Sequence, residues 1–363
     1  MTNIFHIVSD KTWAGPEQYA HDLISRLKDD EFYVEVVCNK HEQILDRYRK
    51  LEVPISILPL KGLYDIDSPV RLARMLKRGN NVLHVHTFRD AFTAVLAKHI
   101  TENQNVKIVL SVHGMTKPRL NYVTRRIYRE VDRFIFSSQK AFDLYMTKAP
   151  KATKSKAVVI RESVLRSPLS ANTADLRSRI GMKPGQTLLM FHGRLCHEKG
   201  IDVLLRGLTQ LDKNTYQMVV IGEGQSKFVT QLKGFIVANQ MVRNVTFLGF
   251  EPNVQPLIGQ CDIGIVPSVS PESMGMAVLE YMMQGKAVIT TDNGAQTEYL
   301  ENGVNSLLVK PGDHFALADS IKTLIDNPIE RTRLGAHSKN DFDRHLNYDH
   351  YYEKMAELYR SLF

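Results

Sequence analysis

Short apolar runs alternate along the chain with longer stretches in which apolar residues recur every three or four positions. The short runs are typical of buried strands, and the periodic stretches are typical of amphipathic helices. The pattern predicts strands at 3–8, 32–38, 55–58, 82–85, 107–112 and 133–136, then a second series at 187–192, 217–221, 245–248, 263–266, 287–290 and 306–309. Because strands that alternate with helices form parallel sheets, we expect an α/β protein with two doubly wound, Rossmann-like domains facing across a cleft.

The stretch 148–174 separates the two series. It is rich in Lys, Ser, Ala and Thr and contains Pro150 and Pro168, which predicts a linker with a short strand. A chain of 363 residues has the length of two domains, which we bound at 1–168 and 169–344. The remaining segment, 345–363, predicts an amphipathic C-terminal helix from its apolar positions: Tyr348, Tyr351, Tyr352, Met355, Leu358, Tyr359 and Leu362.

The net charge of +8 is unevenly distributed. Residues 1–165 hold 27 Lys and Arg against 18 Asp and Glu, whereas the rest of the chain holds 20 against 21. The excess is densest at 117–156, which includes Arg125, Arg126 and Arg129. Such a surface is either merely solvated or faces an anionic partner. Since no nucleic-acid-binding motif accompanies it, we prefer an anionic membrane surface to nucleic acid.

The chain begins like a first strand rather than a signal peptide, and no apolar run approaches the ~20 residues that span a bilayer. Cys38, Cys196 and Cys261 show neither metal-ligand spacing nor a disulfide pattern. We therefore expect a cytoplasmic protein with free thiols, or one peripheral at the inner face of the plasma membrane. We expect no metal and no cofactor.

The most informative segment is 267–285, where a Pro- and Ser-rich loop leads into an apolar helix that starts near Gly275. Free N–H groups at such a helix start attract phosphate, with 273–276 as the candidate contacts (Ser273, Met274, Gly275 and Met276). Glu280 follows about 7 Å along the helix and needs a donor, for which a ribose diol is suitable. Glu272 precedes the helix and can reach the far side of the phosphates. The alternative is an ordinary surface loop with a solvated carboxylate.

A second candidate is the strand-to-helix turn 193–200, in which Gly193 precedes Arg194 and Gly200 follows Lys199. These two cations form a plausible clamp for a diphosphate, although cations in a loop are often simply exposed to solvent.

Two further candidates lie in the first half. Gly15, before Pro16, permits close approach of the backbone to a ligand. The dinucleotide fingerprint G-x-G-x-x-G is absent there, which disfavours a nicotinamide or flavin site. His113 ends a predicted strand and can enter a cleft, but a structural hydrogen bond is the alternative for it, as for His84 and His86.

Taken together, these residues resemble retaining glycosyltransferase family 4, which has two Rossmann-like domains in the B-type fold. The matching motifs are G-R-L-x-x-x-K-G at 193–200, Gly222-Glu-Gly224, Phe247-Leu-Gly249, Pro267-Ser268, the E-x7-E pair Glu272 and Glu280, 285–289, and 301–313. The resemblance implies a C-terminal helix that crosses back to the N-terminal domain, which binds the acceptor, and a C-terminal domain that binds the nucleotide-sugar.

The resemblance also implies roles for single residues. Arg194 and Lys199 match the cations that stabilise the leaving diphosphate in place of a metal. Glu280 matches the ribose-binding carboxylate and Glu272 the residue near the donor sugar, while 273–276 supply N–H groups. Gly15 matches a loop near the donor phosphates and His113 a histidine near the donor sugar.

Two departures from the family leave the donor open: the loop 14–17 keeps one glycine of a usual pair, and Ser273-Met274 replaces the usual pattern after Glu272. The expected function is metal-independent, retaining transfer of a hexose from a UDP- or GDP-sugar to a glycan acceptor. We expect this acceptor to be lipid-linked and the pathway to be bacterial surface polysaccharide biosynthesis (capsule, O-antigen or lipopolysaccharide). The alternatives are a non-catalytic nucleotide-sugar-binding scaffold subunit and a sugar-nucleotide 2-epimerase.

Overall fold

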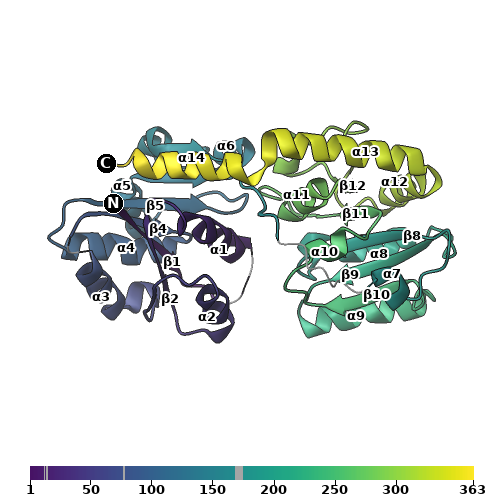
Figure 1. The fold of residues 1–363 in the computed structure, drawn as a ribbon, viewed down its shortest axis with the longest axis horizontal. Helices are drawn as coiled ribbons and strands as arrows, with labels where there is room; N and C mark the ends of the chain where they lie inside the picture. Colours follow the sequence, from purple (N-terminus) through teal and green to yellow (C-terminus); the bar gives the residue numbers. More distant parts are fainter. Residues whose placement is uncertain (12, 14, 77, 168–174) are drawn as a thin grey trace. The chain divides into compact units, whose positions relative to one another are not determined.

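The computed structural model describes residues 1–11, 13, 15–76, 78–167 and 175–363. The chain divides into two compact units: unit 1, Met1–Glu162 with Asp349–Phe363, and unit 2, Ser163–Tyr348. Both are α/β units with a parallel sheet, as the sequence predicts (Figure 1). The expected boundary between residues 168 and 169 lies outside the described residues.

The sheet of unit 1 has seven parallel strands in the order β3-β2-β1-β4-β5-β6-β7. Its strands are β1 Thr2–Val8, β2 Tyr33–Cys38, β3 Ile55–Ile57, β4 Asn80–Val85, β5 Val106–Val112, β6 Arg133–Phe136 and β7 Ala157–Val159. The last of these is the short strand expected in the linker. The helices are α1 Gly15–Leu27, α2 Glu42–Arg49, η1 Gly62–Tyr64, α3 Asp67–Met75, α4 Phe88–Ile100, α5 Tyr122–Glu130, α6 Gln139–Met146 and η2 Lys151–Lys156.

The sheet of unit 2 has six parallel strands in the order β10-β9-β8-β11-β12-β13. Its strands are β8 Thr187–His192, β9 Tyr216–Ile221, β10 Val245–Gly249, β11 Ile263–Val266, β12 Ala287–Thr291 and β13 Leu307–Val309. The helices are α7 Leu176–Arg179, η3 His197–Lys199, α8 Ile201–Leu208, α9 Ser226–Ala238, α10 Gln255–Ile258, α11 Met276–Met283, η4 Ala295–Glu298, α12 His314–Asp326, α13 Pro328–Asp341 and the π-helical η5 Phe342–Leu346.

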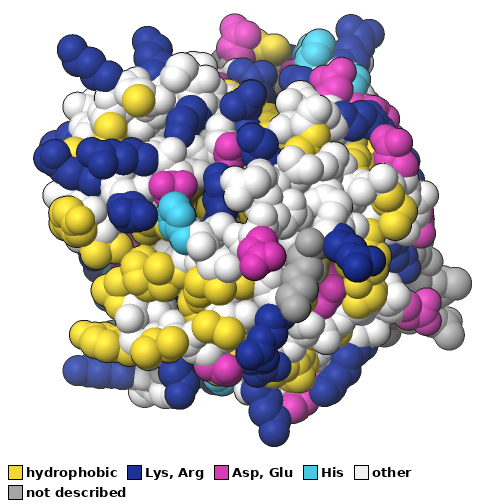
Figure 2. Space-filling model, turned by 90° about the vertical axis from the view of Figure 1, so that its left-hand side faces the viewer, with side chains coloured by type: hydrophobic (Ala, Val, Ile, Leu, Met, Phe, Trp, Pro, Cys, Tyr) yellow, Lys and Arg dark blue, Asp and Glu magenta, His cyan; other side chains and the backbone are white. Residues whose placement is uncertain are grey.

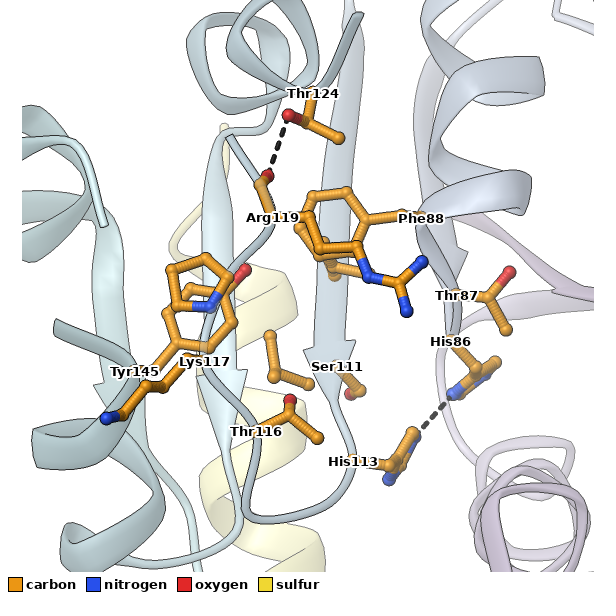
Figure 3. Close-up of a pocket in the computed structure, with 13 residues that line it drawn as sticks. His86, Thr87, Phe88, Ser111, His113, Thr116, Lys117, Arg119, Thr124 and Tyr145 are labelled. Atoms are coloured by element: carbon orange, nitrogen blue, oxygen red, sulfur yellow. Dashed lines mark hydrogen bonds between the residues drawn. The ribbon is translucent and has the colours of Figure 1, made fainter. Parts of the chain in front are cut away.

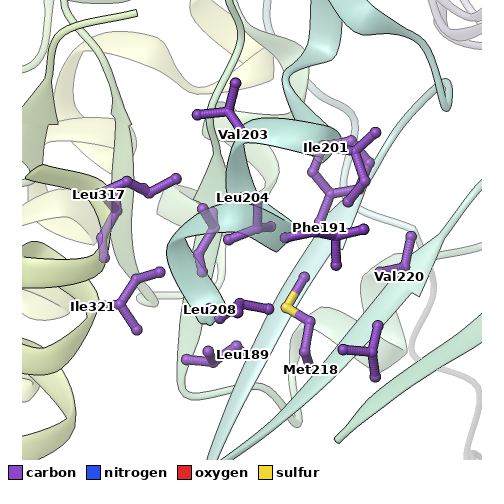
Figure 4. Close-up of a cluster of buried hydrophobic side chains, with 14 of the residues drawn as sticks. Leu189, Phe191, Ile201, Val203, Leu204, Leu208, Met218, Val220, Leu317 and Ile321 are labelled. Atoms are coloured by element: carbon purple, nitrogen blue, oxygen red, sulfur yellow. The ribbon is translucent and has the colours of Figure 1, made fainter. Parts of the chain in front are cut away.

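Apolar side chains fill both faces of each sheet, which is why the strands are nearly continuous apolar runs in the sequence. In unit 2 one such cluster joins β8 and β9 to α8 and α12 through Leu189, Met218, Leu204 and Ile321 (Figure 4). The strand order reverses between β1 and β4 in unit 1, and between β8 and β11 in unit 2. Ligands of doubly wound sheets bind at the carboxyl ends of the strands on either side of this reversal.

The C-terminal helix α14, Tyr348–Arg360, packs on unit 1, as expected (Figure 1). The Tyr359 hydroxyl lies 2.6 Å from Nδ1 of His84, and the Tyr352 hydroxyl donates to Asp30 at 2.5 Å. The helix begins three residues later than predicted because Asn347 is extended, with φ −67° and ψ 159°. The predicted apolar positions of the helix are all buried.

Candidate functional site

Two loops of unit 2 meet at the reversal of strand order, where β8 and β11 end. The loop after β8 carries Arg194 and Lys199, and the loop after β11 carries Glu272. The backbone carbonyl of Glu198 accepts hydrogen bonds from the N–H groups of Val269, at 2.9 Å, and Ser270, at 3.1 Å. The two strongest motifs of the sequence therefore form one structural feature.

Gly200 makes this contact possible. Its φ is +68°, and a Cβ atom there would lie 2.0 Å from the backbone oxygen of Pro267. Only glycine combines this left-handed conformation with so close an approach. Gly200, which ends the 193–200 motif, is therefore required for close contact with the loop after β11.

The structure pairs Lys199 with Glu272. The Lys199 ammonium lies 2.6 Å from Oε1 of Glu272, and the same oxygen accepts a hydrogen bond from the buried Ser268 hydroxyl at 2.5 Å. The Arg194 side chain, in contrast, is exposed and makes no hydrogen bond or ion pair with the described residues. The expected clamp therefore contains one held cation and one that is exposed to solvent.

Helix α11 begins where the sequence predicts, after Gly275, whose φ is +80°. The N–H groups of the first turn, at Met276 and Ala277, have no acceptor within the helix. The loop before the helix is held from behind, because the Tyr299 hydroxyl donates to the carbonyl of Met274 at 2.5 Å. This arrangement leaves a fixed helix N-terminus, with its positive dipole end, beside the Lys199–Glu272 pair.

Glu280, one turn into α11, makes a contact that sequence reasoning missed. Its Oε2 lies 2.7 Å from Nε2 of His192, the last residue of β8. Its side chain is 20% exposed, so it is neither solvated nor fully buried. The available signal was a polar residue at a strand end directly before Gly193, the position from which side chains of parallel sheets reach ligands.

In unit 1, Gly15 begins α1, and a Cβ atom there would meet nothing within 4 Å. Open space beside Gly15 thus leaves room for the close approach of a ligand that the sequence predicts. Residue 14 of the same loop lies outside the described residues. Trp13 of this loop packs against Arg47, whose guanidinium lies 4.2 Å from the centre of the Trp13 ring.

His113 belongs to a chain of hydrogen-bonded groups. Its Nδ1 lies 3.0 Å from Oε1 of Glu162 and its Nε2 lies 3.2 Å from Nδ1 of His86, whose Nε2 lies 3.4 Å from Nδ1 of His6. If Glu162 is ionised, one neutral arrangement satisfies the chain, in which every ring donates from Nδ1 and accepts at Nε2. The last atom, Nε2 of His6, is buried without a partner. Sequence reasoning had singled out neither His6 nor Glu162.

His84 lies beside this chain, between the Tyr359 hydroxyl and the Ser111 hydroxyl, 2.6 and 2.8 Å away. Burial lowers the pKa of His6 to about 3, and the pKa values of His84 and His86 well below the usual range. Nitrogens of these three histidines lie within 4.8 Å of one another, a set suited to a metal ion that the sequence spacing does not reveal. Because His84 uses both nitrogens in hydrogen bonds, we interpret the set as a neutral polar network.

A pocket of about 420 Å³ opens in unit 1 beside His86 and His113, at the ends of β4 and β5 (Figure 3). Phe88, Lys117, Arg119 and Tyr145 are among the residues that line this pocket. Hydroxyl groups, aromatic rings and cations thus line one cavity, which suits a polar ligand with apolar faces.

The arginines of the basic stretch lie on α5. Arg125, Arg126 and Arg129 are all exposed, and close to them Tyr122 is 85% and Leu120 42% exposed. Figure 2 shows one face of the molecule, on which Lys and Arg side chains lie next to groups of hydrophobic side chains. Among the described residues, no helix is long and apolar enough to cross a membrane.

The chain is similar in sequence to known glycosyltransferases over half to four fifths of its length. It is 28% identical over 306 residues to the phosphatidyl-myo-inositol mannosyltransferase of Mycobacterium leprae, covering 81% of this chain and 78% of that one. It is 24% identical over 292 residues to the lipopolysaccharide core biosynthesis mannosyltransferase LpcC of Rhizobium leguminosarum, covering 79% of each. The chain spans only 48% of an uncharacterized glycosyltransferase of Methanocaldococcus jannaschii, to which it is 24% identical over 51% of its own length.

The fold also matches solved structures. HepE of Anabaena, in complex with UDP-glucose, superimposes with a TM-score of 0.85 at 20% sequence identity, covering 99% of both chains. The model of glycosyltransferase family 4 matches residues 13–162, and that of glycosyl transferases group 1 matches residues 172–341. The chain therefore belongs to the glycosyltransferases that join a family 4 domain to a group 1 domain in the two-Rossmann, B-type fold.

Proposed function

We propose that the protein moves a hexose from a UDP- or GDP-sugar to a glycan acceptor, with retention at the anomeric carbon and without a metal ion or cofactor. The observation that carries this proposal is the edge of unit 2 where β8 and β11 end. Lys199, the N-terminus of α11 and Glu280 lie there along one continuous path. Two of the relatives are mannosyltransferases, and the similar HepE was solved with UDP-glucose, which supports a sugar nucleotide as the donor.

Each group has a part in this proposal. The N–H groups at the start of α11, from Gly275 just before the helix and from Met276 and Ala277 in its first turn, receive the diphosphate. Glu280 lies about 6 Å further along the helix for the ribose. Arg194 and Lys199 stabilise the charge that develops on the leaving diphosphate. Since Glu272 holds Lys199 at 2.6 Å, a bound diphosphate would compete with this carboxylate for the ammonium group.

The acceptor is proposed to bind in the pocket of unit 1. His113 lies at one end of this pocket, and Lys117 and Arg119 add positive charge. We propose that the exposed arginines of α5 hold the protein at an anionic membrane surface, in the cytoplasm, where a lipid-linked acceptor of surface polysaccharide would be found. Exposed Tyr122 next to these cations is typical of an interfacial helix.

The first experiment screens UDP- and GDP-sugars for binding and for slow hydrolysis by the full chain. We expect Arg194→Ala and Lys199→Ala each to lower turnover about 100-fold, as for the loss of one donor to a developing oxyanion. Lys322→Ala, in an exposed ion pair with Asp326 on α12, is the matched control. Wild-type rates in both site variants would refute the clamp. Binding without transfer to any glycan would favour a scaffold, and an epimerised free sugar nucleotide would favour an epimerase.

The second experiment measures binding to vesicles with and without anionic lipid at several salt concentrations. Neutralising Arg125, Arg126 and Arg129 together should abolish the salt-sensitive part of binding, because about 1 kcal/mol per cation is lost near the surface. The control neutralises three exposed lysines of unit 2: Lys227, Lys233 and Lys322. Equal binding to neutral and anionic vesicles would contradict the membrane proposal.

A further inference from the structure

A line of four polar groups runs through unit 2 to the proposed ribose carboxylate. The Tyr281 hydroxyl lies 2.9 Å from the backbone oxygen of Met190 and 2.9 Å from Nδ1 of His192. The opposite ring nitrogen of His192, Nε2, lies 2.7 Å from Oε2 of Glu280. The carboxylate is thus connected to the backbone of β8 through two side chains.

The protons of this line can be counted. A tyrosine hydroxyl has one hydrogen, so Tyr281 donates either to Met190 or to His192. If it donates to His192, the neutral ring carries its hydrogen on Nε2. If it donates to Met190, Nδ1 of His192 must donate to Tyr281, and the ring is an imidazolium. Since an ionised carboxylate only accepts, Nε2 of His192 donates to Glu280 in both arrangements.

The line is rigid because its members are packed. Tyr281 is fully buried, and the His192 ring stands edge-on to it with ring centres 4.9 Å apart. The Tyr281 ring occupies the space that a side chain at Gly264 would need, since a Cβ atom there would lie 2.3 Å from the ring. The His192 side chain is only 9% exposed. One rotamer of Glu280 is therefore fixed before any ligand binds.

We propose that His192 is a positioning residue for the ribose of the donor, a role that rests on the proposed function. By holding Oε2 of Glu280, it directs Oε1 and the remaining lone pairs of the carboxylate at the ribose hydroxyls. The side-chain entropy of Glu280 is then lost on folding rather than on binding. His192 thereby gives the site its discrimination between ribose and deoxyribose.

The test is a thermodynamic cycle that combines a substitution in the protein with removal of the 2′-hydroxyl from the nucleotide. Calorimetry with the full chain measures binding of UDP and GDP, and of their 2′-deoxy forms. The variants are His192→Leu, which removes the donor, and His192→Gln, whose amide can replace Nε2–H. His197→Leu is the control, because His197 is 74% exposed on the neighbouring loop.

For the wild type, we expect the 2′-deoxy form of the preferred nucleotide to bind about 10-fold to 100-fold more weakly, as for a hydrogen bond to a charged group. His192→Leu should weaken binding of the ribonucleotide about 10-fold and leave binding of the 2′-deoxynucleotide nearly unchanged. The difference in affinity between the two nucleotides should therefore become smaller. His192→Gln and His197→Leu should both show the wild-type difference in affinity between the ribonucleotide and the 2′-deoxynucleotide. Tyr281→Phe, which keeps the ring packing, should reduce this difference in part.

Two outcomes overturn the proposal. If His192→Leu and Tyr281→Phe weaken both nucleotides equally, His192 serves the fold and not the ribose. If both variants keep the wild-type affinity for each nucleotide, Glu280 does not need the hydrogen bond from His192 to bind ribose. Failure of the wild type to bind either UDP or GDP would instead refute the proposed function itself, and with it the role of His192.

Discussion

Acidification should destabilise unit 1 well above the pH at which ordinary carboxylates titrate, because His6, His84 and His86 are buried as neutral rings. Burial lowers the pKa of His6 from 6.5 to about 3 and lowers the other two well below 6.5. In the unfolded chain the three histidines have ordinary pKa values, near 6.5. Between about pH 6.5 and pH 3 the unfolded chain therefore binds protons that the folded chain does not, so stability falls as the pH falls.

The size of the effect follows from the linkage relation. On moving from pH 8 to pH 5, a histidine with folded and unfolded pKa values of about 3 and 6.5 costs about 2 kcal/mol of stability. The lowered pKa values of His84 and His86 act in the same direction as that of His6. Asp90 acts in the opposite sense, because burial raises its pKa to about 6, and it returns about 1 kcal/mol at pH 5. His6 and Asp90 together leave a net loss of about 1 kcal/mol at pH 5, to which His84 and His86 add.

The chain offers a specific probe of this unit. Trp13, its single tryptophan, lies in unit 1 and packs on Tyr48 and Arg47. Urea unfolding followed by tryptophan fluorescence should show a midpoint at least about 0.5 M lower at pH 5 than at pH 8, for an m-value of about 2 kcal/mol per M. His6→Gln should remove about 2 kcal/mol of this pH dependence, whatever it costs at pH 8.

The exposed His99 is the control, since His99→Gln should leave the pH dependence as in the wild type. The reasoning fails if His6→Gln and the wild type lose the same stability between pH 8 and pH 5. It also fails if the fluorescence transition of the wild type does not move over this range.

Three further predictions concern single contacts. Gly200→Ala should destabilise unit 2 by about 3 kcal/mol, since its Cβ would overlap the loop after β11; Gly303→Ala, with φ +76° and open space, should cost only about 1 kcal/mol in the same circular-dichroism urea titration. Tyr299→Phe should weaken nucleotide binding in calorimetry with little change in melting temperature, because it frees the loop before α11. Tyr359→Phe should lower the stability of unit 1 by about 1 kcal/mol in the fluorescence assay, through loss of the hydrogen bond to His84.

Much of the fold could be predicted from local pattern. Strands buried on both faces must be apolar throughout, so that 133–136, 187–192 and 263–266 were predicted at their observed bounds. The start of a helix could also be predicted where a glycine precedes it, as Gly275 precedes α11. The C-terminal helix was visible from its spacing, although its start was not, because a single extended residue, Asn347, sets it.

The candidate site was only partly visible. Lys199 and Glu272 could be named from their motifs, but their pairing at 2.6 Å depends on β8 and β11 being neighbours in the sheet. His192 and Glu280 are 88 positions apart, and no local pattern connects them. Gly15 was expected to allow close approach of the backbone to a ligand; the open space beside it leaves room for one, and the role stays a prediction.

What the sequence by itself determined was therefore the local structure and the chemical types available at each strand end, because burial and backbone geometry act over a few residues. Only the tertiary structure decided which of these groups meet. His6 looks like any residue within an apolar strand until β1 lies beside β4 and brings it to His84 and His86. Hydrogen bonds between side chains depend on distances of a few ångströms across strands, and the order of strands in the sheet sets those distances.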